Sequence, residues 1–386
     1  MFEIEFWWLV ALPLFFALGW VAARIDIRQI IKESRAMPAA YFRALKLLVA
    51  EDTARATDVL VDMARNERGN RDLQLALAGL FRRKGETDRA IRIHQLLLQE
   101  AELDVSEQQA VELELALDFL AAGLLDRAEK HLRRLDGTSL EARALPALLD
   151  LYSAEQDWER AIETARRLEE VSGRPRPQQI AQYWCEIAQR AFNHTRDADC
   201  EAAIAAALAA NYKCTRANLI AGQLAQRRGD AQAALEHWQR IEAQDPEALP
   251  LVAGLIADTA IAAGCADTGA NLLRGYWQQC PTVDVLDAAI RLIEVANGAG
   301  AASQFLADAV RQRPSLLVLA KQLEHGGAGS ELATLRQLLA QHTRRLGQYR
   351  CSACGFRARS HYWHCPACAQ WETYPARRVE ELNIHD

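Results

Sequence analysis

Hydrophobic side chains follow two patterns in this chain, a continuous run near its start and a helical periodicity through its middle. The run, Phe6–Ala23, contains 18 residues and no charged side chain. A helix of that length would be about 27 Å long, close to the hydrocarbon thickness of a bilayer. Tryptophans lie near both ends of the run, where indole rings favour the headgroup regions. The pattern predicts one N-terminal transmembrane helix, with residues 1–24 forming the anchor and a short outer tail.

Charges beside the run indicate its orientation. A cleaved signal peptide begins with basic residues, but the only charged side chains before the run are Glu3 and Glu5. Basic residues follow the run instead, beginning at Arg24. Because cytoplasmic flanks are rich in Lys and Arg, we expect the bulk of the chain to be cytoplasmic, with residues 25–38 as a juxtamembrane linker. The small residues at the end of the run leave a cleaved signal peptide as the alternative.

Small and large apolar residues recur with helical spacing between residues 39 and 320. A small residue is followed by apolar ones four and seven positions later, as in Ala234, Trp238 and Ile241. The eight small residues that begin this pattern are Ala56, Ala90, Ala128, Ala161, Cys200, Ala234, Gly269 and Ala302. Successive members are 33 to 39 positions apart. A period near 34 residues is typical of repeated pairs of antiparallel helices that stack into a solenoid. We therefore expect an all-α solenoid over residues 39–320.

Helix ends support the same register. Prolines follow the last three small residues by twelve positions, at Pro246, Pro281 and Pro314, where we expect the second helix of each pair to stop. An Arg-Pro-Arg-Pro stretch at 174–177 indicates a longer loop. The repeats resemble the tetratricopeptide repeat. That resemblance implies a groove for peptide or protein partners rather than an active site.

Two Cys-x-x-Cys pairs follow a final helical segment, residues 321–347. Four thiolates in this spacing can converge on one tetrahedral metal ion. The predicted ligands are Cys351, Cys354, Cys365 and Cys368. Sulfur ligation of this kind suits iron and zinc alike, so both remain open. We expect residues 348–386 to form a small module around one such ion.

Residues around the cysteines refine this expectation. Gly355 is placed to adopt a positive φ, which lets backbone N–H groups point at sulfur. Two histidines, His361 and His364, lie nearby, but we expect all four ligands to be cysteines. Arginines are expected to offset the negative charge of the thiolates, at Arg350, Arg357, Arg359, Arg377 and Arg378. Aromatic residues are expected to form an apolar shell for the module, at Tyr349, Phe356, Tyr362, Trp363, Trp371 and Tyr374.

The cysteine layout resembles rubredoxin-like and zinc-ribbon modules, which leaves two roles for the ion. A structural ion would fold the module, whereas an electron carrier would need exposed iron and a redox partner. We expect the structural role. The formal net charge of −6 and the membrane anchor argue against a third possibility, a nucleic-acid-binding zinc ribbon. The sequence contains no diagnostic catalytic motif, so we expect no enzyme activity.

The order of parts extends the resemblance to the whole chain. The most specific stretches are Leu80–Gln95, Asp118–Leu132 and Tyr349–Trp371. Together they resemble the lipopolysaccharide assembly protein B family of Gram-negative bacteria. The resemblance implies a single-pass inner-membrane adaptor whose metal ligands are the four cysteines. It further implies that the adaptor promotes degradation of the committed-step lipid A deacetylase by the membrane AAA+ metalloprotease, and gathers other lipopolysaccharide-synthesis or transport proteins. A membrane-tethered rubredoxin-like electron-transfer protein remains the alternative.

Overall fold

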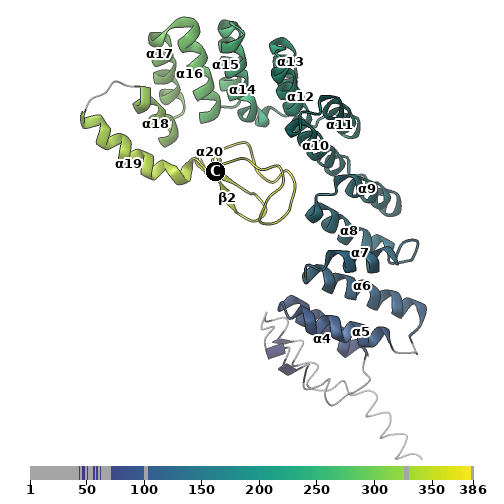
Figure 1. Ribbon diagram of the computed structural model, residues 1–386. Helices are drawn as coiled ribbons and strands as arrows, with labels where there is room; N and C mark the ends of the chain where they lie inside the picture. Colours follow the sequence, from purple (N-terminus) through teal and green to yellow (C-terminus); the bar gives the residue numbers. More distant parts are fainter. Residues whose placement is uncertain are drawn as a thin grey trace, which may run out of the picture. The chain divides into compact units, whose positions relative to one another are not determined.

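The computed structural model describes residues 71–99, 103–325 and 330–383, with a few positions between 43 and 61 (Figure 1). Contacts divide the chain into two units, Met1–Leu151 and Tyr152–Asp386. The predicted anchor and linker, residues 1–38, lie outside the described residues. Within the described ranges, no helix combines the length and apolar character needed to cross a bilayer.

The described part of the first unit consists of helices packed as antiparallel neighbours. They are α4 (Arg71–Arg83), α5 (Thr87–Leu98), α6 (Val105–Ala121), α7 (Leu125–Arg133) and the start of α8 (Glu141–Glu155). Helix α6 begins with a capping box, in which the Asp104 carboxylate accepts the Glu107 N–H and the Glu107 side chain accepts the Asp104 N–H. A buried polar pair, His94 and Asp118, joins α5 to α6. Both side chains are fully enclosed, which agrees with a structural role for His94.

The second unit continues the helix pairs and ends in a small module. Its helices are α9 (Trp158–Ser172), α10 (Pro177–Asn193), α11 (Asp197–Ala210), α12 (Thr215–Arg227), α13 (Ala231–Gln244), the 3₁₀ turn η1 (Pro246–Ala248), α14 (Pro250–Ala262), α15 (Ala266–Gln279), α16 (Val283–Asn297), α17 (Ala299–Gln312), α18 (Leu316–His325) and α19 (Ser330–Leu346). The module contains the antiparallel strands β1 (Tyr349–Arg350) and β2 (Arg357–Ala358), followed by α20 (Val379–Asn383).

The small residues that set the sequence period are buried where helices cross, as predicted. All eight are enclosed, from Ala56 to Ala302. Gly222 shows why size matters, because a Cβ there would lie 2.2 Å from the indole nitrogen of Trp238. At Gly269 a Cβ would lie 2.8 Å from the Cβ of Ala260. Two helices approach this closely only where one of them lacks a side chain.

The predicted helix stops are also confirmed. Helices α13, α15 and α17 end two residues before Pro246, Pro281 and Pro314 respectively. The Arg-Pro-Arg-Pro stretch forms the loop between α9 and α10, and Pro177 occupies the first turn of α10. Local sequence chemistry therefore sets the boundaries of these helices.

The module lies against the first helices of successive pairs in the second unit (Figure 1). Its side chains contact α10, α12, α16 and α18, the first helices of four pairs, and also Trp158 at the start of α9. Most of these contacts fall near the N-terminal ends of the helices. The result is a seam between the module and the solenoid that extends over several repeats.

Candidate metal centre

The structure brings the four predicted ligands together. Their sulfur atoms all lie within 4.8 Å of one another. The Cys351–Cys368 and Cys354–Cys365 sulfur pairs are each 3.8 Å apart. Metal–sulfur bonds of about 2.3 Å in a tetrahedron place neighbouring sulfurs about 3.8 Å apart. The spacing therefore fits one tetrahedral ion.

Two matching turns hold these sulfurs. In the first turn the Cys351 N–H donates to the Phe356 carbonyl, and the Gly355 N–H donates to the Cys351 carbonyl. The second turn repeats both hydrogen bonds at equivalent positions, with Ala369 in place of Gly355. Gly355 has the predicted positive φ, +76°, and Ala369 adopts +53°. The second value was not foreseen, because alanine gives no sequence signal for left-handed backbone.

Electrostatics at the site favour a bound cation. Burial opposes ionisation of Cys351, but the Thr373 hydroxyl and the Cys354 and Ala353 N–H groups outweigh it and lower the pKa of Cys351 to about 6. At Cys368 an N–H from Gln370 favours the thiolate, but burial and the neighbouring cysteines raise its pKa to about 12. Four thiolates therefore share this space only when positive charge lies among them. A divalent zinc or iron ion bound by the four cysteines would supply that charge.

The two histidines near the cysteines have other partners. His361 Nε2 lies 2.9 Å from the Tyr374 carbonyl oxygen, and His364 Nε2 lies 2.9 Å from the Ala369 carbonyl oxygen. Burial, above all, lowers the pKa of His361, which agrees with a neutral ring that donates to this carbonyl. The four-cysteine ligand set stands as the arrangement that this geometry supports.

Aromatic rings form one end of the seam. The Trp371 ring centroid lies 6.0 Å from that of Trp158 on α9 and 5.6 Å from that of Tyr183 on α10, both in edge-to-face geometry. Beside them, the Gln182 amide donates to the Glu372 carboxylate over 2.7 Å. Trp371 was expected to cover the module itself. It does stack on His364 within the module, with ring centroids 4.4 Å apart, and it also docks the module on the solenoid.

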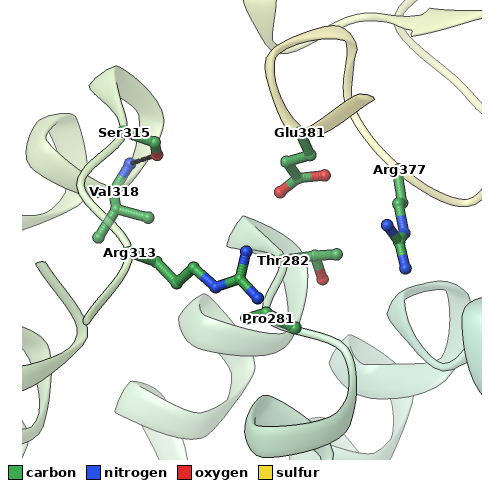
Figure 2. Close-up of a pocket in the computed structure, with 7 residues that line it drawn as sticks. All are labelled: Pro281, Thr282, Arg313, Ser315, Val318, Arg377 and Glu381. Atoms are coloured by element: carbon green, nitrogen blue, oxygen red, sulfur yellow. Dashed lines mark hydrogen bonds between the residues drawn. The ribbon is translucent and has the colours of Figure 1, made fainter. Parts of the chain in front are cut away.

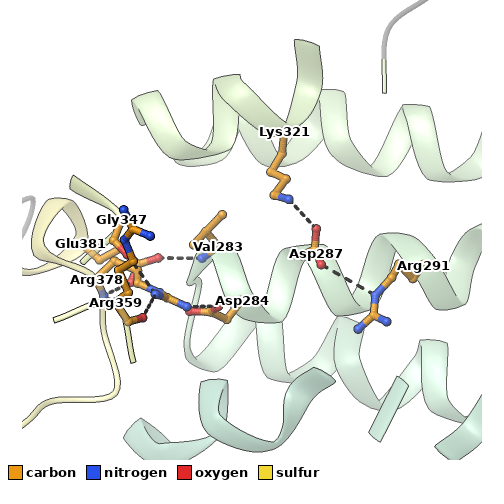
Figure 3. Close-up of polar contacts among 9 residues, drawn as sticks. All are labelled: Val283, Asp284, Asp287, Arg291, Lys321, Gly347, Arg359, Arg378 and Glu381. Atoms are coloured by element: carbon orange, nitrogen blue, oxygen red, sulfur yellow. Dashed lines mark hydrogen bonds and ion pairs between the residues drawn. The ribbon is translucent and has the colours of Figure 1, made fainter. Parts of the chain in front are cut away.

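Charged groups form the other end of the seam (Figure 3). Arg378 makes a bidentate ion pair with Asp284 on α16, with N–O distances of 2.6 and 2.8 Å. Its remaining nitrogen donates to the Gly347 carbonyl, and its guanidinium lies 4.0 Å from the Tyr349 ring centroid. Planar guanidinium and carboxylate groups match in this geometry, so the contact is specific as well as attractive.

Two adjacent glutamates of α20 cap helices that lie far away in the sequence. Glu381 accepts the N–H of Val283 at the start of α16, over 2.6 Å. Glu380 accepts the N–H groups of Leu316 and Leu317 at the start of α18. The first N–H groups of a helix have no partner within it and favour negative charge, whereas burial opposes ionisation of Glu381 and raises its pKa.

Part of the predicted role for the arginines is wrong. Arg378 pairs with Asp284, and Arg377 lies 3.5 Å from the Glu247 carboxylate. These two side chains hold the module on the solenoid instead of offsetting the thiolate charge. Two members of the expected aromatic shell, Phe356 and Tyr362, are exposed, whereas Tyr349 and Tyr374 are buried as expected.

Comparison with known proteins places the chain in a family. A family model described as "Rubredoxin metal binding domain" matches residues 349–374. "Lipopolysaccharide assembly protein B" of Escherichia coli strain K12 is 30% identical over 395 residues, which cover 99% of this chain and 100% of that protein. The chain belongs to the lipopolysaccharide assembly protein B family. The resemblance read from the sequence motifs is thereby confirmed.

A second relative agrees with this membership. The lipopolysaccharide assembly protein B of Haemophilus influenzae is 26% identical over 400 residues, again covering 99% of this chain and 100% of the relative. Among solved structures, the C-terminal part of a tetratricopeptide-repeat protein from Cytophaga hutchinsonii has 10% identity and a TM-score of 0.40. That match covers 71% of this chain and 96% of the other. The fold assignment itself rests on the helix pairs described above.

Proposed function

We propose that this protein is a non-catalytic adaptor in lipopolysaccharide assembly, anchored in the inner membrane by Phe6–Ala23. Membership of the lipopolysaccharide assembly protein B family supports the part of this proposal that concerns lipopolysaccharide assembly. The observation that supports an adaptor is the seam, in which the module built on four cysteines joins helices of several repeats. A site devoted to holding helices together suits a scaffold better than a reaction centre.

We further propose that the bound ion has a structural role. When bound, it supplies the positive charge that lets the four thiolates lie together. The loops that the cysteines shape carry Trp371 and Glu372 to one end of the seam, and the chain after them carries Arg378 to the other. A module this small depends on its metal for folding, so loss of the ion releases both ends.

The partners in this proposal are the membrane AAA+ metalloprotease and the committed-step lipid A deacetylase, whose degradation the adaptor promotes. Anchoring adaptor and protease in one membrane raises their effective local concentration to about the millimolar range. Other lipopolysaccharide-synthesis or transport proteins would be gathered in the same way. No catalytic step by the adaptor is required.

A polar groove beside the module is the proposed docking place for a partner segment. Its volume is about 610 Å³, and α14, α16 and α18 contribute to its walls. Alternating charges run along this groove. Figure 3 shows Asp287 between Lys321, at 2.9 Å, and Arg291, at 3.7 Å. Arg291 also pairs with Asp258 over 2.6 Å. Such alternation suits a polar peptide that carries both signs of charge.

The test measures deacetylase half-life in cells that carry variants of the full-length protein. Replacing Phe6–Ala23 with a soluble tag should abolish regulated turnover while the solenoid stays folded. Lys321→Glu should slow turnover by placing like charges along the groove, whereas Arg311→Glu on the exposed face of α17 is the matched control. Normal turnover in the untethered protein would contradict the proposal. Recovery of protease and deacetylase in crosslinked pulldowns from membranes is the accompanying measurement.

Exposure of Cys354 favours one competing function, electron transfer through a rubredoxin-like iron. An exposed ligand edge is where electrons would enter or leave. Metal analysis and the visible spectrum of the purified protein separate the two functions. A colourless zinc protein that still supports deacetylase turnover would exclude the redox role.

A further inference from the structure

A small cavity lies at the charged end of the seam, where α16 and α18 begin and α20 passes over them (Figure 2). Its polar lining comes from Thr282, Arg313, Ser315, Arg377 and Glu381. The free volume is about 30 Å³. One water needs about 10–15 Å³ on this measure, so the enclosed part of the cavity has room for about two waters.

The Thr282 hydroxyl is the unusual feature of this cavity. Thr282 is the N-cap residue of α16, where a threonine side chain normally accepts a hydrogen bond from the helix. It makes no such bond here, and Glu381 accepts the first N–H of α16 instead. The residue is 2% exposed, and its Oγ1 has no hydrogen-bond partner among the described residues. Burying a hydroxyl without a hydrogen-bond partner costs free energy. This cost indicates that a bound water or ion forms the missing hydrogen bond.

Two guanidinium groups approach the cavity from opposite sides (Figure 2). The Nε of Arg377 is buried without a partner in the described structure, and its Nη2 reaches the exposed Glu247 only over 3.5 Å. Arg313 is exposed and has no ion-pair partner within the described ranges. Buried hydrogen-bond donors and an unpaired positive charge therefore face the same small cavity. This combination is typical of an anion-binding site.

The remaining lining groups are compatible with an anion. The Glu381 carboxylate already accepts the N–H groups of Val283 and Arg378, each over 2.6 Å. Ser315 accepts the Val318 N–H through its Oγ, which leaves the hydroxyl proton free to donate. Among the lining residues, the two arginines and an ionised Glu381 carry a net formal charge of +1, which the exposed Glu247 carboxylate beside Arg377 partly offsets.

We propose that this cavity binds a phosphate-type oxyanion, held by Arg313, Arg377 and the Thr282 hydroxyl. The anion bridges the end of α17, the start of α16 and the module. It therefore strengthens docking of the module without contact with the metal. The site is independent of the proposed adaptor function, because its occupancy can be measured without any regulatory assay.

The test is calorimetric titration of the full-length, metal-loaded protein with inorganic phosphate at constant ionic strength. Wild-type protein should bind one phosphate per chain, and Thr282→Val and Arg313→Gln should each weaken binding about tenfold or more. Arg311→Gln, on the same helix but outside the cavity, should bind like the wild type. Because Arg313 is exposed, its variant tests the site even if the threonine variant fails to fold.

Two results would overturn the proposal. Phosphate that binds no more tightly than chloride would leave the cavity as a water site. Equal binding by the wild type and Arg313→Gln would place the anion elsewhere. A second titration with glycerol 1-phosphate distinguishes the possible sources of the anion. If this ester binds and Arg313→Gln weakens its binding, the natural ligand is a phosphorylated metabolite or headgroup. Binding of inorganic phosphate alone points to the free ion.

Discussion

The two ends of the seam hold the same module by different chemistry. At one end Trp371 packs edge to face on Trp158 and Tyr183, so the contact rests on apolar area and ring geometry. At the other end Arg378, Glu380 and Glu381 satisfy a carboxylate and the first N–H groups of two helices. The aromatic end should respond little to salt, whereas the charged end should respond to both salt and pH. Both ends of the seam depend on the metal centre, because the module folds around it.

The largest expected effect comes from removing the metal centre. Cys365→Ser should abolish metal binding and unfold the module, since structural ions of this kind supply on the order of 10 kcal/mol to folding. Both ends of the seam should then be lost together. Limited proteolysis between residues 348 and 383 measures this directly. Cys265→Ser is the matched control, because Cys265 lies at the start of α15, outside the module. Retained protection in Cys365→Ser would show that the module folds without its ion.

Trp371→Ala should release the aromatic end at a cost of about 3 kcal/mol, the lower end of the range for buried aromatic residues. Hydrogen exchange in peptides around Trp158 and Tyr183 should rise about a hundredfold, equally at low and high salt. Trp371→Phe keeps an edge-to-face ring and should retain most of the protection. If the loss of protection in Trp371→Ala depended strongly on salt, the contact at this end would not be mainly apolar, and the account would be contradicted.

Arg378→Gln should weaken the charged end by about 2 kcal/mol, because Asp284 is left without its bidentate partner in a half-buried place. Exchange in the first turn of α16 should rise about thirtyfold at low salt. The difference from wild type should shrink as salt is added. Arg311→Gln, which removes an exposed arginine from α17, should change nothing.

The smallest predicted effect is a pH dependence at Glu381. Burial, with the charge of Asp284, raises the pKa of Glu381 to about 7 from its ordinary 4.5. A raised folded-state pKa means that the stabilisation is full below pH about 4.5 and is lost as pH rises to about 7. Docking should therefore weaken by about 1.5 kcal/mol between pH 5.5 and 7. Glu381→Gln should remove this dependence of docking strength on pH. An unchanged pH dependence in that variant would show that another group causes it.

Sequence reasoning predicted what local spacing encodes. The small residues at helix crossings, the prolines at helix ends and the four cysteines are all read from neighbours within a few tens of positions. Gly355 was likewise identifiable from its place directly after Cys354. Each of these features has a physical cause that lies close by in the chain.

The seam could not be predicted in the same way. Arg378 and Asp284 are 94 positions apart, and Gln182 and Glu372 are 190 apart. Before the fold brings them together, nothing in their local sequence distinguishes these residues from other surface charges. The contacts of Trp371 with the solenoid could not be predicted for the same reason, because its nearest sequence neighbours are the metal ligands.

Hydrogen exchange at the starts of α16 and α18, before and after metal removal by a chelator, tests the central claim most directly. The N–H groups of Val283, Leu316 and Leu317 donate to carboxylates of the module. If the metal folds the module that caps these helices, its removal should speed exchange there and leave α15 unchanged. Unchanged exchange at both helix starts in the metal-free protein would contradict the account.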